Sequence, residues 1–446
     1  MHRLTTALVR RFSLATCLAV FTPCVLADTL VVPTDHATIQ DAIDVALPGD
    51  TILVKSGSYT ENVVVPQALA GLRIRAKGKA IVDAHPSMVE QDIGPGLVIL
   101  APNVRIEGLE IRNAAFGDNP YGILVTETGN TLLKDVRITG CVGVGIVVNG
   151  CFDVRIERCT IEACGGGILA TGDRTVVRKT SIRNCAGPAI LGGGLDVVVE
   201  ACRVATVRGD FAIAALGDGA LIRKNSVVDA EGTAIFVDGA EARIEANRIE
   251  HCGAGISTTG PSPKLDQNTV AGGGAGSFCI FVAQGQDATI ERTTITECAG
   301  FGIYVAADCA QASLVKNVVR RSGTASEAAF AIDAEDCVLV KNQARECARD
   351  GFSIRGANAT LEQNLADRNA QDGFDVEATA ITATLRSNLA SRNGAEGIEI
   401  NAMGVALEHN VAKANRIDLA SSGSVLTFVA NSYASGGLFQ QPQIDG

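Results

Sequence analysis

The sequence predicts an all-β fold, a right-handed parallel β-helix, in which one chain winds into a single-stranded solenoid of stacked coils of about 22 residues. A repeated tetrapeptide, a column of asparagines and short alternating apolar segments predict it. The tetrapeptide has the form Gly-Ile-x-Val, and its first copies start about 21 to 23 residues apart, a spacing typical of a solenoid. Copies begin at Gly122, Gly145, Gly167, Ala189, Ala212, Ala234, Gly255, Cys279, Gly302, Ala331, Gly351, Gly373, Gly397 and, in degenerate form, Arg416.

Each coil is expected to hold three short strands. The Gly-Ile-x-Val segment is the first, and two further segments of the x-Ile-x-x type follow it after turns. Strands of three or four residues cannot bury a face alone, but stacked coils pair their backbones along the axis and form a continuous core. The apolar alternation has a period of two, which excludes a helical solenoid.

A second marker follows about 15 residues after most of these starts. It is an asparagine at Asn225, Asn247, Asn268, Asn317, Asn342, Asn364, Asn388, Asn410 and Asn431, and in earlier coils a cysteine or threonine holds the same register. An asparagine at a nearly buried bend can hydrogen-bond the equivalent residue one coil further on. The column is therefore predicted to be structural.

The start of the solenoid requires a cover, because an open end exposes unpaired strand edges and a bare core. Residues 38–46 combine an N-capping Thr38 with apolar residues three and four apart, which predicts a short amphipathic helix. Pro48-Gly49-Asp50 ends it. This helix is expected to plug the first coil.

Six cysteines share one register at the end of the third strand, where a small apolar residue packs inward. They are Cys141, Cys164, Cys185, Cys252, Cys298 and Cys347. We interpret them as core residues. A disulfide between neighbouring coils, such as Cys141 to Cys164, remains an alternative because adjacent coils lie within the Cα range that a disulfide accepts.

Residues 1–27 have the features of a cleavable secretory signal: three arginines, an apolar run from Phe12 to Phe21 and the small-residue exit Val25-Leu26-Ala27. The β-helix domain is expected over residues 28–446, secreted or periplasmic and without membrane insertion. Removing the signal takes three positive charges from a chain of net charge -11. Such a chain is a poor partner for nucleic acid and for anionic membranes.

The N-terminal segment resembles the entry of pectin-lyase-like β-helix proteins. The resemblance lies in Ala37-Thr38-Ile39-Gln40-Asp41-Ala42-Ile43, Pro48-Gly49-Asp50 and Gly57-Ser58-Tyr59-Thr60-Glu61. That superfamily includes pectate lyases, polygalacturonases, pectin methylesterases, alginate epimerases and the NosD-type proteins. The resemblance implies a polysaccharide or cell-wall glycan as partner, with the substrate groove on the sheet of the Gly-Ile-x-Val strands.

Outward-facing positions of those strands form two columns near the C-terminus. The first is predicted to hold Tyr304, Asp333, Ser353, Asp375, Glu399 and Asp418, and the second Glu335, Arg355 and Glu377. Like charges about 5 Å apart repel by about 1 kcal/mol in water and by more near a protein surface. Such a stack requires a counter-charge, a bound cation or raised pKa values.

One hypothesis is a calcium-assisted polysaccharide lyase. Asp372-Gly373-Phe374-Asp375 is similar to the Asp-Gly-Ile-Asp stretch of family 9 polysaccharide lyases, where the acids hold calcium, so calcium ligands are expected at Asp372, Asp375, Glu377 and Glu399. The expected substrate contacts are Tyr304, Asp333, Glu335, Arg355 and Glu377. No lysine stands beside Glu399 to act as the base that those lyases use.

Two alternatives use the same residues. In a glycosidase, Asp375, Glu399 and Asp418 would be the catalytic carboxylates, since neighbouring coils match the separation in retaining enzymes. The polygalacturonase and methylesterase signatures are missing. In a non-catalytic structural or adhesion protein, Glu335, Arg355 and Glu377 would form a solvated ion-pair ladder, and no cofactor would be needed.

Overall fold

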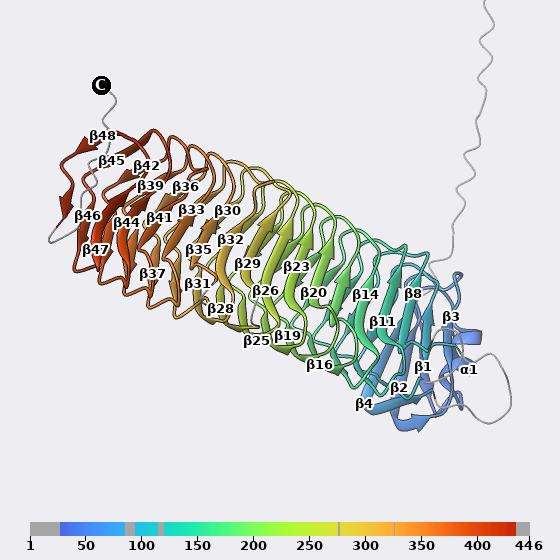
Figure 1. The fold of residues 1–446 in the computed structure, drawn as a ribbon. Coiled ribbons are helices and arrows are strands. Elements are labelled where there is room, and N and C mark those ends of the chain that lie inside the picture. Colours follow the sequence, from blue (N-terminus) through green and yellow to red (C-terminus); the bar gives the residue numbers. More distant parts are fainter. Residues whose placement is uncertain (1–26, 85–93, 115–119, 275–276, 325, 434–446) are drawn as a thin grey trace, which may run out of the picture.

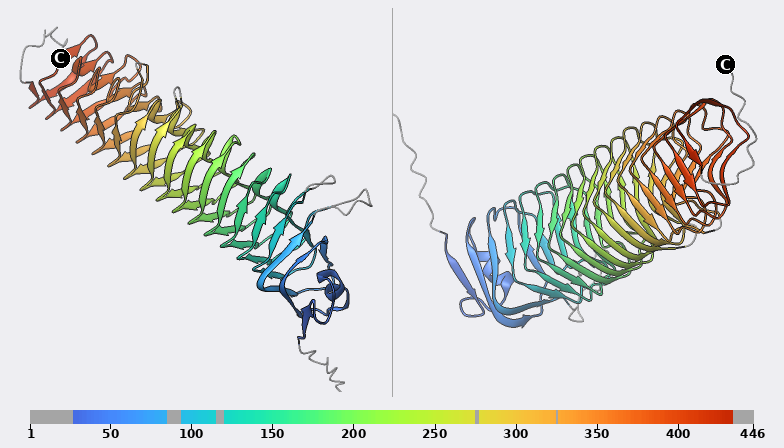
Figure 2. Two further views of the ribbon diagram at one scale, coloured as in Figure 1. Left: turned by 90° about the horizontal axis from the view of Figure 1, so that it is seen from below. Right: turned by 90° about the vertical axis from the view of Figure 1, so that its left-hand side faces the viewer.

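The computed structural model describes residues 27–84, 94–114, 120–274, 277–324 and 326–433. They form an elongated right-handed parallel β-helix, with the N-terminal coils at one end and the C-terminal coils at the other (Figures 1 and 2). The predicted fold is confirmed. The expected signal peptide lies almost wholly outside the described residues. Among the described helices, none has the length and apolar character needed to cross a membrane.

The Gly-Ile-x-Val segments form one parallel sheet of 16 described strands, one from each coil. Its strands in spatial order are β3 (Val63–Val65), β5 (Leu97–Ile99), β8 (Ile123–Thr126), β11 (Val144–Asn149), β14 (Gly166–Ala170), β17 (Ile190–Gly192), β20 (Phe211–Leu216), β23 (Thr233–Asp238), β26 (Ala254–Thr259), β29 (Phe278–Ala283), β32 (Phe301–Val305), β35 (Phe330–Ile332), β38 (Phe352–Ile354), β41 (Phe374–Val376), β44 (Glu396–Ile400) and β47 (Ile417–Ser421). All other described strands belong to a second, 33-stranded sheet. There β1 (Thr29–Val32), β2 (Thr51–Tyr59) and β4 (Arg73–Asp83) run through it as single strands, and from β6 (Arg105–Glu107) on each coil gives it two.

The coils stack in register, so that equivalent residues lie above one another. In the first strands Ile123 aligns with Ile146, and Ile146 with Ile168. All three are buried, as are the inward residues of the other two strands of each coil. This alignment joins the inward side chains of every coil into one continuous hydrophobic core.

The predicted asparagine ladder is present. Asn342 donates from Nδ2 to Asn364 Oδ1 at 3.0 Å, and its backbone N–H donates to the same oxygen at 2.9 Å. The same pattern runs from Asn225 to Asn268 and from Asn317 to Asn431. A second, unpredicted ladder follows Asn369, Asn393 and Asn415, spaced 24 and 22 residues apart.

The N-terminal cover is helix α1 (Ile39–Val45), which closes one end of the solenoid (Figure 1). Thr38 is its N-cap, as the sequence predicts, and it also forms a capping box with Asp41. The carboxylate of Glu61 also accepts hydrogen bonds from the backbone N–H groups of Ile39 and Gln40, both at 2.9 Å. Glu61 therefore fastens the helix to the first coil.

The register cysteines are buried, which confirms their assignment to the core. Cys141 and Cys164 are free thiols, so the alternative of a bridge between them is wrong. Within the described residues the one disulfide joins Cys279 and Cys298, whose Cα atoms are 6.1 Å apart. Both positions fit the core pattern equally well, so the pairing has no sequence signal of its own.

The C-terminal coils replace isoleucine by phenylalanine on the inside. Phe330, Phe352 and Phe374 stack in the core with ring centroids 4.6 and 4.8 Å apart. Strand β35 therefore begins at Phe330, and Ala331, not Asp333, aligns with Tyr304. The predicted repeat at Ala331 is wrong by two residues, because a shift of two keeps the inside-outside alternation unchanged.

Candidate functional site

The acidic face lies on the outer side of β41 and β44, near the C-terminal end of the solenoid (Figure 1). Phe374 and Val376 are buried, so Asp375 between them faces outward. In the neighbouring coils Ser353 and Glu399 align with Asp375. The structure thus places two of the predicted carboxylates on adjacent coils.

Asp372 joins this pair from the turn that precedes β41. Asp372, Asp375 and Glu399 each offer one carboxylate oxygen within 4.8 Å of the others. Asp375 is only 8% exposed, and its Oδ1 is buried without a hydrogen-bond partner in the described part of the chain. Asp372 accepts the backbone N–H of Glu396 through Oδ1 at 2.7 Å. Oδ1 of Asp375 is therefore free to accept a hydrogen bond or to bind a cation.

These carboxylates lie close together and are largely buried, and both conditions disfavour their ionised forms. Burial, reinforced by the nearby charges of Asp350, Glu377 and Glu399, raises the pKa of Asp375 to about 7. Burial raises the pKa of Asp372 to about 8, with a contribution from a hydrogen bond to the side chain of Glu396. The two groups hold protons at pH values where ordinary carboxyls are ionised, unless a cation replaces those protons.

Sequence reasoning missed Asp350. It is 2% exposed, accepts the backbone N–H of Asp372 at 3.1 Å, and faces Arg349 Nε across 3.1 Å. Burial raises its pKa. The available signal was the acid before glycine in successive coils, Asp350-Gly351, Asp372-Gly373 and Glu396-Gly397.

An ion-pair ladder flanks the carboxylate group. Arg355 donates from Nε to Glu377 Oε1 at 2.8 Å and from Nη1 to Asp333 Oδ1 at 3.3 Å. Burial opposes the charge of Arg355, but the two carboxylates outweigh it and raise the pKa of the guanidinium. Tyr304 donates its hydroxyl to Asp333 Oδ2 at 2.8 Å, and burial followed by this bond raises its pKa to about 12.

This ladder corrects the predicted one. Glu335 is exposed in the turn after β35, where it bridges to Ala310, and Asp333 takes its place beside Arg355. The cause is the two-residue shift at Phe330. Glu377 forms its ion pair with Arg355. It lies outside the group formed by Asp372, Asp375 and Glu399.

The predicted outward stack through Asp418 is also wrong. Ala420, not Asp418, aligns with Glu399. Asp418 is 1% exposed and accepts hydrogen bonds from the backbone and side-chain amides of Asn415, at 3.2 and 3.0 Å. Asp418 stands at the repeat position that glycine holds in earlier coils, and there it is the next acceptor of the second asparagine ladder. Its side chain therefore does not lie beside Glu399.

An aromatic cluster lies on the same sheet, on the N-terminal side of the acidic face. Phe278, Phe281, Phe301 and Tyr304 are half-buried, with ring centroids 4.9 to 5.7 Å apart. Tyr304 lies three coils from Asp375, which corresponds to about 14 Å along the axis. Tyr304 was expected as a substrate contact, whereas the three phenylalanines around it were not.

Solved structures similar to this chain share low sequence identity with it. An alginate lyase from Paenibacillus sp. str. FPU-7 is 17% identical over 58% of this chain and 99% of that one, with a TM-score of 0.44. A DFA-IIIase from Arthrobacter chlorophenolicus A6 is 13% identical over 60% and 84%, with a TM-score of 0.41. The A-module of the Azotobacter vinelandii mannuronan C-5 epimerase AlgE6 is 12% identical over 89% and 92%, with a TM-score of 0.30.

A search of curated proteins finds no match. The family described as "Right handed beta helix region" matches in four overlapping stretches, residues 52–204, 121–270, 211–329 and 324–433. Together these stretches cover most of the chain and agree with the coils seen in the structure. The protein therefore belongs to the right-handed β-helix family.

Proposed function

We propose that the protein is a secreted or periplasmic β-helix protein that binds an acidic polysaccharide through a divalent cation, with calcium as the preferred ion. Asp372, Asp375 and Glu399 would hold the cation. The observation that carries the proposal is Oδ1 of Asp375, which is buried without a hydrogen-bond partner among the described residues and belongs to a group of three carboxylates. Buried charged groups are rarely left without a partner or a metal.

The donor set fits calcium better than other common metals. Calcium favours six to eight oxygen ligands in a flexible arrangement, and carboxylates bind it through one or both oxygens. No histidine or cysteine belongs to the group, so the nitrogen and sulfur ligands that favour zinc or copper are lacking there. A bound calcium would supply a positive charge to which a uronate carboxylate can bind on an otherwise acidic face.

The neighbouring residues suit a glycan that runs along the solenoid axis. The aromatic cluster around Tyr304 offers apolar faces on which sugar rings can pack. Arg355 adds a permanent positive charge between the aromatic cluster and the carboxylates. A polymer that contacts both would span at least three coils, or about 14 Å.

The geometry favours binding over β-elimination. Elimination requires a base that accepts a proton from the sugar ring. The two arginines beside this face are both paired with carboxylates, Arg349 with Asp350 and Arg355 with Glu377 and Asp333, and these charges disfavour loss of a proton. Metal-free hydrolysis is the second candidate, because Asp375 and Glu399 lie on adjacent coils, at about the carboxylate separation of retaining glycosidases.

The test is binding of the full chain to immobilised glycans, with calcium and then with a chelator. Probes are polygalacturonate and alginate, which carry carboxylates, and dextran, which is neutral. We expect calcium-dependent retention on the acidic glycans, at least tenfold weaker after Asp375→Asn and unchanged after Glu335→Gln, an exposed acid outside the site. Equal retention with and without calcium would contradict the proposal, and new reducing ends would indicate hydrolysis.

A further inference from the structure

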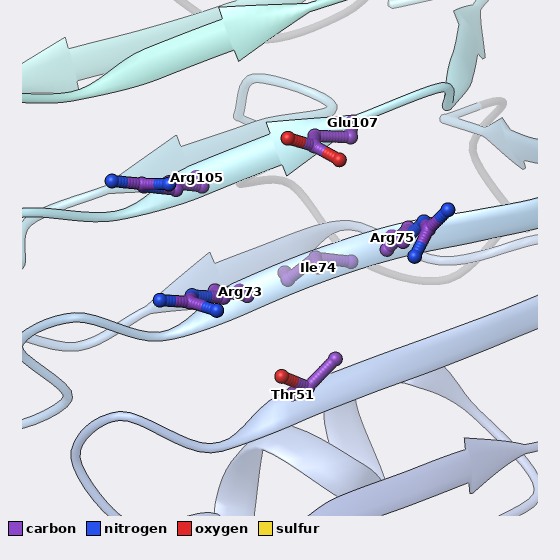
Figure 3. Close-up of a pocket in the computed structure, with 6 residues that line it drawn as sticks. All are labelled: Thr51, Arg73, Ile74, Arg75, Arg105 and Glu107. Carbon is purple, nitrogen blue, oxygen red and sulfur yellow. The ribbon is translucent and has the colours of Figure 1, made fainter. Parts of the chain in front are cut away.

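A row of unpaired arginines crosses the N-terminal coils on the second sheet. It runs over β2 (Thr51–Tyr59), β4 (Arg73–Asp83), β6 (Arg105–Glu107), β9 (Leu132–Lys134) and β12 (Arg155–Glu157). The aligned residues are Thr51, Arg73, Arg105, Leu132 and Arg155. Figure 3 shows Arg73 and Arg105 one coil apart, with their guanidinium groups on the same side of the strands.

The adjacent row of the same strands shows how this chain usually arranges charges. Two residues further along each strand, the aligned residues alternate in sign as Arg75, Glu107, Lys134, Glu157, Arg178 and Glu200. The row of Arg73, Arg105 and Arg155 contains no acid. Arg73 and Arg105 are directly opposite each other, and Leu132 separates Arg105 from Arg155. Like charges directly opposite each other in a sheet are destabilising, and a bound anion would relieve that repulsion.

No described carboxylate lies within ion-pair distance of these three arginines, and Asp153 acts on Arg155 only at longer range. Several exposed arginines elsewhere form ion pairs, such as Arg158 with Asp135 at 2.6 Å and Arg174 with Asp153 at 2.7 Å. Neither Arg73, Arg105 nor Arg155 forms an ion pair within the described ranges, although the chain carries a net charge of -11. An unneutralised cluster of cations in an acidic protein indicates a site for an external anion.

The arginines line a cavity. A hollow of about 260 Å³ lies among Arg73, Arg105 and Arg155, and it is completed by Gly71, Asn103, Asn130, Thr131 and Leu132. No acid lines it. A smaller hollow of about 150 Å³ adjoins it beside Thr51 and Glu107 (Figure 3).

We propose that the larger hollow is an oxyanion-binding site, which accepts a carboxylate, sulfate or phosphate group. The planar guanidinium presents paired N–H donors that match two oxygens of such a group. The anion comes either from a free inorganic ion or from an acidic substituent of a glycan. The site lies on another sheet and at the opposite end of the solenoid from Asp375, so it is independent of the proposed cation site (Figure 1).

Calorimetric titration of the full chain in the presence of a chelator tests the site. Sodium sulfate and a uronate tetrasaccharide are the two probes, at constant ionic strength set with chloride. We expect Arg105→Gln to weaken binding at least tenfold, a free-energy difference of about 1.4 kcal/mol. Arg174→Gln is the matched control, because it removes an exposed arginine that is already paired with Asp153. This control should bind as the wild type does.

The two probes separate the sources of the anion. Binding of sulfate and of the tetrasaccharide, both lost in Arg105→Gln, establishes a general oxyanion site. Binding of only one probe identifies a free ion or a glycan substituent as the ligand. Lack of binding by the wild type, or equal weakening in both arginine variants, overturns the proposal. Because a chelator is present, neither result bears on the proposed calcium site.

Discussion

Raising the pH in the absence of divalent cations should destabilise the protein through Asp375. Its pKa is 3.8 in an unfolded chain and about 7 in the folded one. Between these values the unfolded chain releases the proton and the folded protein keeps it, so stability present in acid is lost as the pH rises to 7. At about 1.36 kcal/mol for each pH unit, the loss is about 4 kcal/mol. Asp372, with a pKa of about 8, extends the loss to higher pH.

The assay is thermal unfolding followed by circular dichroism at pH 5, 6, 7 and 8 in a chelating buffer. Asp375→Asn cannot ionise at this position, so its unfolding temperature should fall less steeply with pH than that of the wild type. Glu335→Gln removes an exposed carboxylate and should follow the wild type. Parallel curves for the wild type and Asp375→Asn would refute the assignment of a raised pKa to Asp375.

Three further predictions concern the scaffold. Asn342→Ala removes hydrogen bonds to Leu314 and Asn364, so the free energy of unfolding measured in urea should fall by about 2 kcal/mol; an unchanged value would exclude a structural ladder. Glu61→Ala deprives the N-terminus of α1 of two acceptors and should cost about 1 kcal/mol, with faster hydrogen exchange in the helix; equal exchange would contradict this role. The ten described free cysteines are buried, and burial raises the pKa of Cys159 to about 12, so a thiol reagent should label them only after unfolding; rapid labelling of the native protein would contradict the packing.

Most of the fold was predictable because every coil must bury the same kinds of side chain and backbone group in the same way. The short strands can bury their inward side chains only by stacking, so the same residue types recur at aligned positions such as Ile123 and Ile146. The asparagine ladder recurs for the same reason, since each bend buries the same backbone groups. The helix at residues 39–45 was predictable from its cap.

The register was not fully predictable. Where Phe330 replaces isoleucine, a shift of two residues leaves the alternation intact, so Asp333 was placed in the wrong column and Glu335 in the wrong ladder. The last coil repeated this error, because Asp418 occupies the position that glycine holds elsewhere. Both errors arose where one coil substitutes an unusual side chain at a repeat position.

Part of the candidate site was predictable and part was not. Asp372, Asp375 and Glu399 stand at recognisable repeat positions, and the structure brings them together. Asp350 lies in a turn outside the two outward columns, so it was missed although it shares the acid-before-glycine pattern with Asp372, and its burial is seen only in the structure. The arginine row lies on the other sheet, and only the coil alignment shows that Arg73 and Arg105 are neighbours.

Calorimetric titration of calcium into the full chain at pH 7 tests the central claim most directly, with Asp375→Asn and Glu335→Gln as the variants compared. The account predicts one calcium ion bound per chain by the wild type and by Glu335→Gln, and loss of that binding in Asp375→Asn. Because the bound ion replaces protons on Asp372 and Asp375, the heat should also change with the ionisation enthalpy of the buffer. No binding by the wild type, or undiminished binding by Asp375→Asn, would contradict a cation site in the acidic cluster.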